Sequence, residues 1–172
     1  MGLADDLGLR LRPPNPAQRL VQTVAATKAG SWVFSRTLPP LDSATQRATG
    51  RTLPEVFASL PVVQVTVTGR RSGLPRTIHL VAIPHDEELA VIGTNFGQGG
   101  TPDWVLNLEA DPRATVSFRG RSFDVVARLA TPAERETIMS MADRTYSGYA
   151  SYRERIVNRE IRVFVLEAAA TD

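Results

Sequence analysis

Hydrophobic and polar residues alternate along several short stretches of the chain after Pro61. Alternation with a period of two is typical of strands that bury one face. It predicts strands over residues 62–68, 76–84, 89–94, 114–119, 122–130 and 159–168. Because helices do not alternate regularly with these strands, we expect an antiparallel sheet rather than a parallel one. The sequence predicts a mainly β fold of the α+β class, with flanking helices around a small barrel of about six antiparallel strands.

Three other stretches follow a helical period instead: residues 16–36, 103–112 and 131–146. The last has the clearest beginning, because Thr131 is a suitable N-cap, Pro132 favours the first turn and Glu134 completes a capping box. The chain therefore divides into a flexible N-terminal lead (1–15), an N-terminal helix and connector (16–60), and a barrel domain (61–172).

Composition limits the classes of function. The 172 residues carry a formal net charge of +2, and this balance does not indicate nucleic-acid binding. Cysteine is absent, which excludes disulfides and thiolate nucleophiles, and two histidines cannot build a histidine-rich metal site. No apolar run is long enough for a transmembrane helix, and the first residues lack the apolar core of a signal peptide. We expect a cytoplasmic protein without a metal, whose N-terminal helix either covers one end of the domain or makes a peripheral membrane contact.

The stretch TGRRSGLPRT, residues 68–77, follows the first predicted strand directly. Its glycines permit turn conformations and let backbone N–H groups approach a ligand closely. Arg70, Arg71 and Arg76 add guanidinium groups, which bind phosphate and carboxylate as planar forks. Two interpretations remain open at this point, a solvated hairpin turn and a binding loop for an anion.

Two further stretches contain candidate site residues. GTNFGQGGTPDW, residues 93–104, leads from a strand into a helix start, where free N–H groups attract anions. Tyr146, Tyr149 and Tyr152 are the only tyrosines of the chain, and their spacing places them near one face of a helix. They either pack in the core or line a pocket as proton donors or substrate anchors. Because no catalytic triad or metalloprotease motif occurs, a bound cofactor is expected to supply any chemistry.

Three segments in this order, PVVQVTVTGRRSGLPRTIHL, GTNFGQ…PDWVLNLEADP and YSGYASYRERIVNREIRVFVLE, resemble the deazaflavin-dependent nitroreductase and quinone reductase family. The resemblance runs from about Trp32 to Glu167. It implies a split β-barrel related to FMN-binding proteins, with residues 61–172 as the coenzyme-binding domain. It also implies an oxidoreductase that uses the reduced deazaflavin coenzyme F-420. Such an enzyme transfers a hydride to a small electron-poor acceptor, such as a quinone, an enone or a nitro compound.

The resemblance assigns roles to individual positions. The phosphate and oligoglutamate tail of the coenzyme would be held by Arg70, Arg71, Ser72 and Arg76. The strand that lies along the coenzyme through its backbone would comprise Thr77, Ile78, His79, Leu80 and Val81. The strand end beside the deazaflavin ring would comprise Ile92, Gly93, Thr94 and Asn95. The segment on the tail and ribityl side would comprise Asp103, Trp104, Val105, Leu106 and Asn107.

The candidate catalytic residues that the resemblance implies are Tyr149, Tyr146, Thr94 and Tyr152, with Tyr149 also near the ring. The hydroxyl of Tyr149 or Tyr146 is expected to protonate the reduced product. Two departures from the family are His79, where proline is frequent, and Asp103, which brings negative charge close to the anionic tail. Because residues on the substrate side differ, nitroreductase activity does not follow from the resemblance.

A second function stays open on the sequence alone, a non-catalytic split barrel that binds coenzyme F-420, FMN, haem or a lipid. FMN fits the long basic loop less well than coenzyme F-420 does, because the anionic tail of FMN is shorter. A barrel edge or the N-terminal helix also offers a surface for a homodimer.

Overall fold

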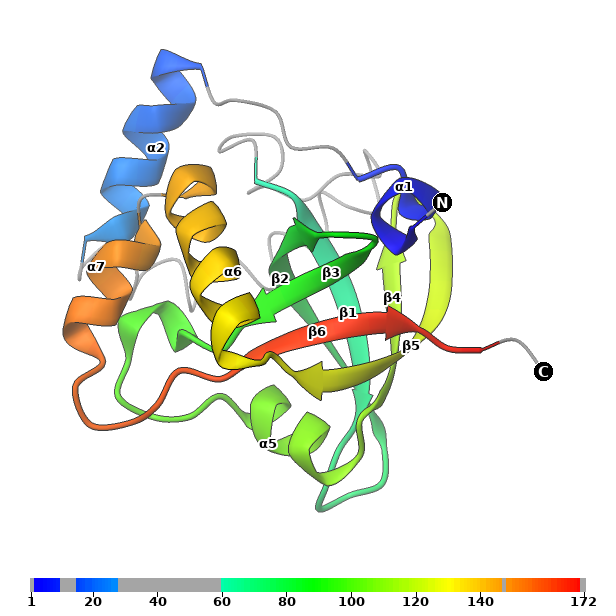
Figure 1. The fold of residues 1–172 in the computed structure, drawn as a ribbon. Helices are drawn as coiled ribbons and strands as arrows, with labels where there is room; N and C mark the ends of the chain where they lie inside the picture. The colour runs from blue at the N-terminus through cyan, green and yellow to red at the C-terminus, as the bar shows by residue number, and fades with distance from the viewer. Residues whose placement is uncertain (1, 10–14, 28–59, 147, 171–172) are drawn as a thin grey trace.

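The computed structural model describes residues 2–9, 15–27, 60–146 and 148–170 of the chain. Within this part, antiparallel strands close into a barrel in the order β1-β2-β3-β6-β5-β4 (Figure 1). The strands are β1 (Val62–Thr68), β2 (Pro75–His85), β3 (Glu88–Ile92), β4 (Arg113–Phe118), β5 (Arg121–Leu129) and β6 (Val163–Ala168). The predicted fold class, a mainly β barrel with flanking helices, is confirmed.

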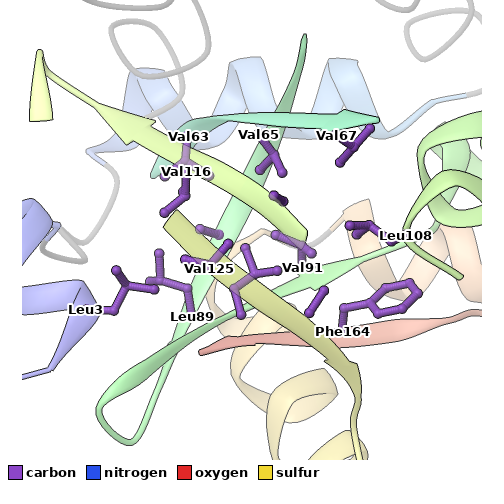
Figure 2. Close-up of a cluster of buried hydrophobic side chains, with 14 of the residues drawn as sticks. Leu3, Val63, Val65, Val67, Leu89, Val91, Leu108, Val116, Val125 and Phe164 are labelled. Carbon is purple, nitrogen blue, oxygen red and sulfur yellow. The ribbon is translucent and has the colours of Figure 1, made fainter. Parts of the chain in front are cut away.

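Side chains from alternate strand positions fill the barrel interior (Figure 2). In β1, Val63, Val65 and Val67 are buried, while the residues between them face outward and are partly exposed. Valine suits these positions because its branched side chain packs well on a pleated surface. Burying each such side chain contributes about 1.5–3 kcal/mol relative to leaving it exposed, so the interior is a principal source of stability.

Helices pack around the barrel (Figure 1). They are α1 (Leu3–Leu7), α2 (Pro16–Ala26), α5 (Asp103–Ala110), α6 (Pro132–Thr145) and α7 (Gly148–Arg155), with a 3-10 turn η1 (Asn95–Gly97). α6 and α7 bury a second apolar cluster against outward-facing side chains of β2, β3 and β6. The predicted capping box of α6 is confirmed: the Glu134 N–H donates to Thr131 Oγ1 over 3.3 Å, and the Thr131 N–H donates to Glu134 Oε2 over 2.8 Å.

The prediction of a flexible lead is wrong for residues 3–9, which are part of the fold. Leu3 and Leu7 of α1 are 3% and 2% exposed, and Leu9 is buried with them in the barrel-interior cluster. α1 packs against β3. The physical reason is that apolar side chains at a barrel end would face water unless another apolar segment covered them.

Other boundaries also differ from the predicted ones. The helix predicted over residues 16–36 is described only as α2, which packs against α7, and its remainder and most of the connector lie outside the described residues. The strand predicted over 159–168 begins at Val163, and Arg159 instead reaches main-chain oxygens beyond the end of β3. The membrane contact of the N-terminal helix is not tested by the fold and stays a prediction.

Candidate functional site

The arginine loop comprises residues 69–76: residues 69–74 connect β1 to β2 as a tight hairpin, and Arg76 is the second residue of β2, opposite Val67 of β1. The Gly69 N–H donates to the Leu74 carbonyl over 2.9 Å, and the Gly73 N–H donates to the Gly69 carbonyl over 2.7 Å. Gly73 has a φ of +66°, a left-handed conformation that glycine adopts without steric cost. At Gly69 an added Cβ would lie 2.8 Å from Ser72 Oγ and 3.1 Å from the Leu74 carbonyl oxygen, so a side chain there would be crowded. The glycines therefore build a compact loop that carries its arginines outward.

Arg70 fastens the arginine loop to α5. Its Nη1 donates to Asp103 Oδ1 over 3.0 Å and to Asn107 Oδ1 over 3.2 Å, and its backbone N–H donates to the same Asn107 oxygen over 3.1 Å. Asn107 is buried, so this side chain holds the loop from inside. Arg70 is thus partly engaged within the protein and is less available to a ligand than the sequence suggested.

Arg71 and Arg76 are exposed, and within the described part of the chain neither guanidinium forms an ion pair or a hydrogen bond. Ser72 is exposed between them, and its Oγ accepts from the Leu74 N–H over 3.3 Å. Unpaired guanidiniums on a fixed loop are donors for an anionic ligand. The hairpin interpretation and the anion-binding interpretation of this stretch are therefore compatible.

The first turn of α5 lies beside the arginine loop (Figure 1). Its cap residue Pro102 provides no side-chain hydrogen bond, which leaves N–H groups of this turn for other partners. Trp104 and Val105 belong to the barrel-interior cluster, and the Trp104 ring lies 6.0 Å from that of Phe164. Contacts of these two residues with a ligand would therefore run through their backbone, whereas the half-buried Leu106 retains some exposed surface.

The backbone after β3 is packed closely against α5. Ile92, Gly93 and Thr94 are buried, and the Gly93 N–H donates to the Arg162 carbonyl over 2.8 Å. A Cβ at Gly93 would lie 2.8 Å from Val105 Cγ2, which explains glycine at this position. The strand end predicted to lie beside a ring is therefore held rigidly between α5 and the segment before β6.

Arg159 holds the same segment from the other side, a role that the sequence analysis missed. Its Nη1 donates to the Gly93 carbonyl over 2.9 Å, and its Nη2 donates to the carbonyls of Thr94 and Gln98 over 3.2 and 3.4 Å. Burial lowers the pKa of the Arg159 guanidinium from its ordinary value. The partners lie more than 60 residues earlier in the chain, so no local pattern could have identified this arginine.

The left-handed turn, residues 95–97, follows directly. Asn95, Phe96 and Gly97 have φ angles of 49°, 55° and 76°. For a non-glycine residue this conformation costs about 1–3 kcal/mol, and it persists only where the surroundings impose it. Here Asn95 Nδ2 donates to the Gly100 carbonyl over 3.0 Å, and an added Cβ on Gly97 would lie 3.1 Å from the Tyr152 ring.

The tyrosine cluster consists of Tyr146, Tyr149 and Tyr152, whose buried rings meet edge to face with centroids 5.7–6.4 Å apart. Tyr146 follows α6, and the other two lie on α7, so the spacing of three spans a break between helices. The hydroxyls of Tyr146 and Tyr152 are hydrogen-bonded over 2.9 Å. Within the described residues the Tyr149 hydroxyl has no such partner. The cluster packs in the outer apolar layer, and one phenol remains available.

Burial raises the pKa of Tyr149 above its ordinary value, and the neighbouring Tyr152 raises it further. Burial also raises the pKa of Tyr146, with additional contributions from Tyr152. Both phenols therefore stay neutral at physiological pH. Neither can act as a phenolate base there, and of the two only the Tyr149 hydroxyl lacks a hydrogen-bond partner among the described residues.

β2 divides its predicted site residues between two faces. Ile78 and Leu80 pack against the barrel interior, and Val81 packs against the outer cluster. On the outer face Thr77 Oγ1 lies 2.9 Å from Thr66 Oγ1, and His79 Nε2 lies 3.2 Å from the Gln64 amide nitrogen. A ligand along this strand would meet backbone groups and small polar side chains.

The described site thus combines a loop with two unpaired guanidiniums, a closely packed strand end and buried phenols on an antiparallel barrel. These features are compatible with a barrel protein that takes an anionic ligand. The chain belongs to the F420H(2)-dependent quinone reductase family, whose model matches residues 40–168. It is therefore an enzyme, an oxidoreductase that depends on coenzyme F-420.

Solved structures agree with this family. A structure described as an F420-H2 dependent reductase (FDR-A) is 30% identical, covers 62% of this chain and 94% of its own, and has a TM-score of 0.57. A structure described as a domain-swapped dimer is 28% identical, covers 81% of this chain and 100% of its own, and has a TM-score of 0.59. A heme binding protein from Mycobacterium smegmatis, 15% identical with a TM-score of 0.50, covers 64% of this chain and 47% of its own and shares the fold alone.

These findings confirm the predicted family and the predicted coenzyme, and they do not favour the non-catalytic alternative or FMN. Among the residues that the structure describes, no helix is both long enough and apolar enough to cross a membrane.

Proposed function

We propose that this chain transfers a hydride from reduced coenzyme F-420 to a quinone, with the coenzyme tail on the arginine loop and the acceptor beside the tyrosine cluster. The observation that carries the proposal is the pair of unpaired guanidiniums, Arg71 and Arg76, on a loop that Arg70 fixes to α5. Two free cations beside an uncapped helix start match a polyanionic tail. The two guanidiniums and the N–H groups of the first turn of α5 are therefore donors that suit the anionic tail of the coenzyme.

The remaining predicted contacts follow the chain away from the arginine loop. α5 and the backbone of Thr77–Val81 would border the middle of the coenzyme, and Ile92–Asn95 would border its ring. Gly93 and Arg159 support this arrangement, because they fix the strand end in one conformation. A rigid wall reduces the ordering that binding would otherwise require.

When bound, the reduced coenzyme supplies a hydride, and a quinone needs one further proton to become a hydroquinone. Tyr149 is the proposed hydrogen-bond donor to the acceptor oxygen, because its hydroxyl has no partner among the described residues and its pKa is raised. Such a donor stabilises negative charge that develops on the oxygen. Tyr146 and Tyr152 would position Tyr149 through ring contacts, and Thr94 would border the reacting atoms.

The test is a fluorescence titration of coenzyme F-420 into the wild-type protein and the variants Arg71→Ala and Arg76→Ala. Each variant should bind about tenfold more weakly or worse, because one charge-assisted contact contributes roughly 1.5–3 kcal/mol. Arg144→Ala is the matched control, since Arg144 is exposed near the end of α6 and has no part in the proposed site. Unchanged affinity in both loop variants would remove the arginine loop from the proposal.

A homodimer is a further part of the proposal. It is supported by the solved relative described as a domain-swapped dimer, 28% identical over its full length. Light scattering during size-exclusion chromatography tests it, and a mass of one chain would contradict it. A peripheral membrane contact of the N-terminal helix remains a prediction, which vesicle co-sedimentation would check.

A further inference from the structure

Phe96 exposes an aromatic ring from a backbone conformation that bulky residues avoid. Its φ is 55°, between Asn95 at 49° and Gly97 at 76°. Asn and Gly adopt left-handed conformations readily, whereas for a bulky residue the same conformation is an outlier. A position that only had to turn the chain would be better occupied by Asn or Gly. The turn alone therefore does not account for phenylalanine at position 96, and its side chain is expected to have a role of its own.

The surroundings fix the backbone of this turn while the Phe96 side chain stays partly exposed. Arg159 Nη2 donates to carbonyls on both sides of the left-handed turn, Thr94 at 3.2 Å and Gln98 at 3.4 Å. Phe96 is 41% exposed, and the other large hydrophobic residues that are exposed in the described part of the chain are all aliphatic. The Phe96 ring thus stays partly in contact with solvent, although α7 packs against the same turn.

We infer that Phe96 is a specificity-determining residue that contacts the ring of the quinone acceptor. The inference rests on the proposed function, which puts Ile92–Asn95 beside the coenzyme ring; Phe96 is the next residue. The left-handed turn also packs against α7, which carries Tyr149 and Tyr152. A flat apolar acceptor at this place would lie between an aromatic ring and a phenol donor. Aromatic rings favour such contacts with other planar rings, so Phe96 selects quinones with an aromatic or extended ring.

The experiment compares Phe96→Asn, which removes the ring and suits the left-handed backbone, with Phe96→Tyr, which keeps a ring. Val157→Asn is the matched control, because Val157 is also an exposed apolar residue, 79% exposed, and lies outside the proposed site. Three quantities are measured for each variant: the thermal midpoint of unfolding, the Kd of oxidised coenzyme F-420, and the binding of menadione. Menadione binding is followed by calorimetry, without coenzyme and with saturating oxidised coenzyme, which cannot reduce it. The KM for menadione is measured separately with reduced coenzyme.

Phe96→Asn should raise the Kd and the KM for menadione by about tenfold, since the menadione ring loses its apolar contact with the phenyl ring of Phe96. Its thermal midpoint should not fall, because the backbone strain is relieved, and its coenzyme Kd should stay unchanged. Phe96→Tyr and Val157→Asn should bind menadione as the wild type does.

Unchanged menadione binding in Phe96→Asn overturns the inference. A lowered thermal midpoint together with weaker coenzyme binding in Phe96→Asn also overturns it, because that result would indicate a structural role. If the wild type fails to bind coenzyme F-420, the proposed function fails, while the titration without coenzyme still decides the role of Phe96.

Discussion

At the scale of single residues, charge pairing decides which arginines are available to a ligand. Asp103 is 85% exposed and holds the Arg70 guanidinium at 3.0 Å, while Arg71 and Arg76 have no partner within the described residues. An anionic coenzyme tail and the Asp103 carboxylate would therefore compete for Arg70. The Asp103 carboxylate is already paired with the Arg70 guanidinium, which reduces the repulsion between Asp103 and the anionic coenzyme tail.

Asp103→Asn should strengthen the binding of coenzyme F-420 by about two- to fivefold, because an exposed ion pair is worth roughly 0.2–1 kcal/mol and its loss frees Arg70. The gain should shrink as salt is raised, since surface charges are screened. Fluorescence titration at low and high ionic strength measures both effects. Weaker binding in Asp103→Asn would instead show that the ion pair preorganises Arg70 for the coenzyme.

The raised pKa of Tyr149 gives a second prediction at this scale. Burial keeps its phenol protonated beyond pH 10, so the hydrogen bond proposed for Tyr149 can form throughout the physiological range. Tyr149→Phe should lower kcat for menadione reduction by about tenfold to a hundredfold at every pH below that value. A pH–rate profile of both proteins checks this. The raised pKa would be contradicted by one result: the wild type loses activity with a midpoint below pH 10, and Tyr149→Phe does not show this loss.

From the sequence alone, candidate site residues were chosen where the residue type itself suggests a chemical role. The glycines and arginines of the loop and the three tyrosines were candidates for this reason. Arg159 and Phe96 were missed because their roles depend on partners and backbone angles that no spacing encodes. For Trp104 the resemblance implied a place on the tail and ribityl side of the coenzyme, but its ring packs in the barrel interior beside Phe164.

At the scale of elements, alternation and capping predicted most of the fold. β1 shows the alternation most clearly, and α6 begins at the predicted capping box. α1 was missed because its five residues are too few for a helical period to be read. Its apolar residues also have no partner nearby in the sequence, since they pack on the barrel interior and on β3. Short elements that are stabilised only by distant contacts are beyond local patterns.

At the scale of the whole molecule, the structure places α1 away from the proposed binding loop. The arginine loop and α5 lie at one end of the barrel, and α1 covers the interior at another (Figure 1). The tyrosine cluster belongs to the outer apolar layer formed with α6 and α7, and the Asn95–Gly97 turn packs against α7. Changes in α1 are therefore expected to alter folding without altering the coenzyme contacts.

Leu7→Ala tests this separation. Leu7 is 2% exposed and joins the barrel-interior cluster, so its truncation should lower the free energy of unfolding by about 2–5 kcal/mol. Leu20→Ala is the matched control, because Leu20 is 67% exposed on α2 and should change stability by less than about 0.5 kcal/mol. Urea denaturation of both variants measures the difference, and the folded Leu7→Ala protein should bind coenzyme F-420 with wild-type affinity. Equal stabilities of the two variants would mean that α1 is detached from the barrel in solution, and that the lead contributes nothing to the core.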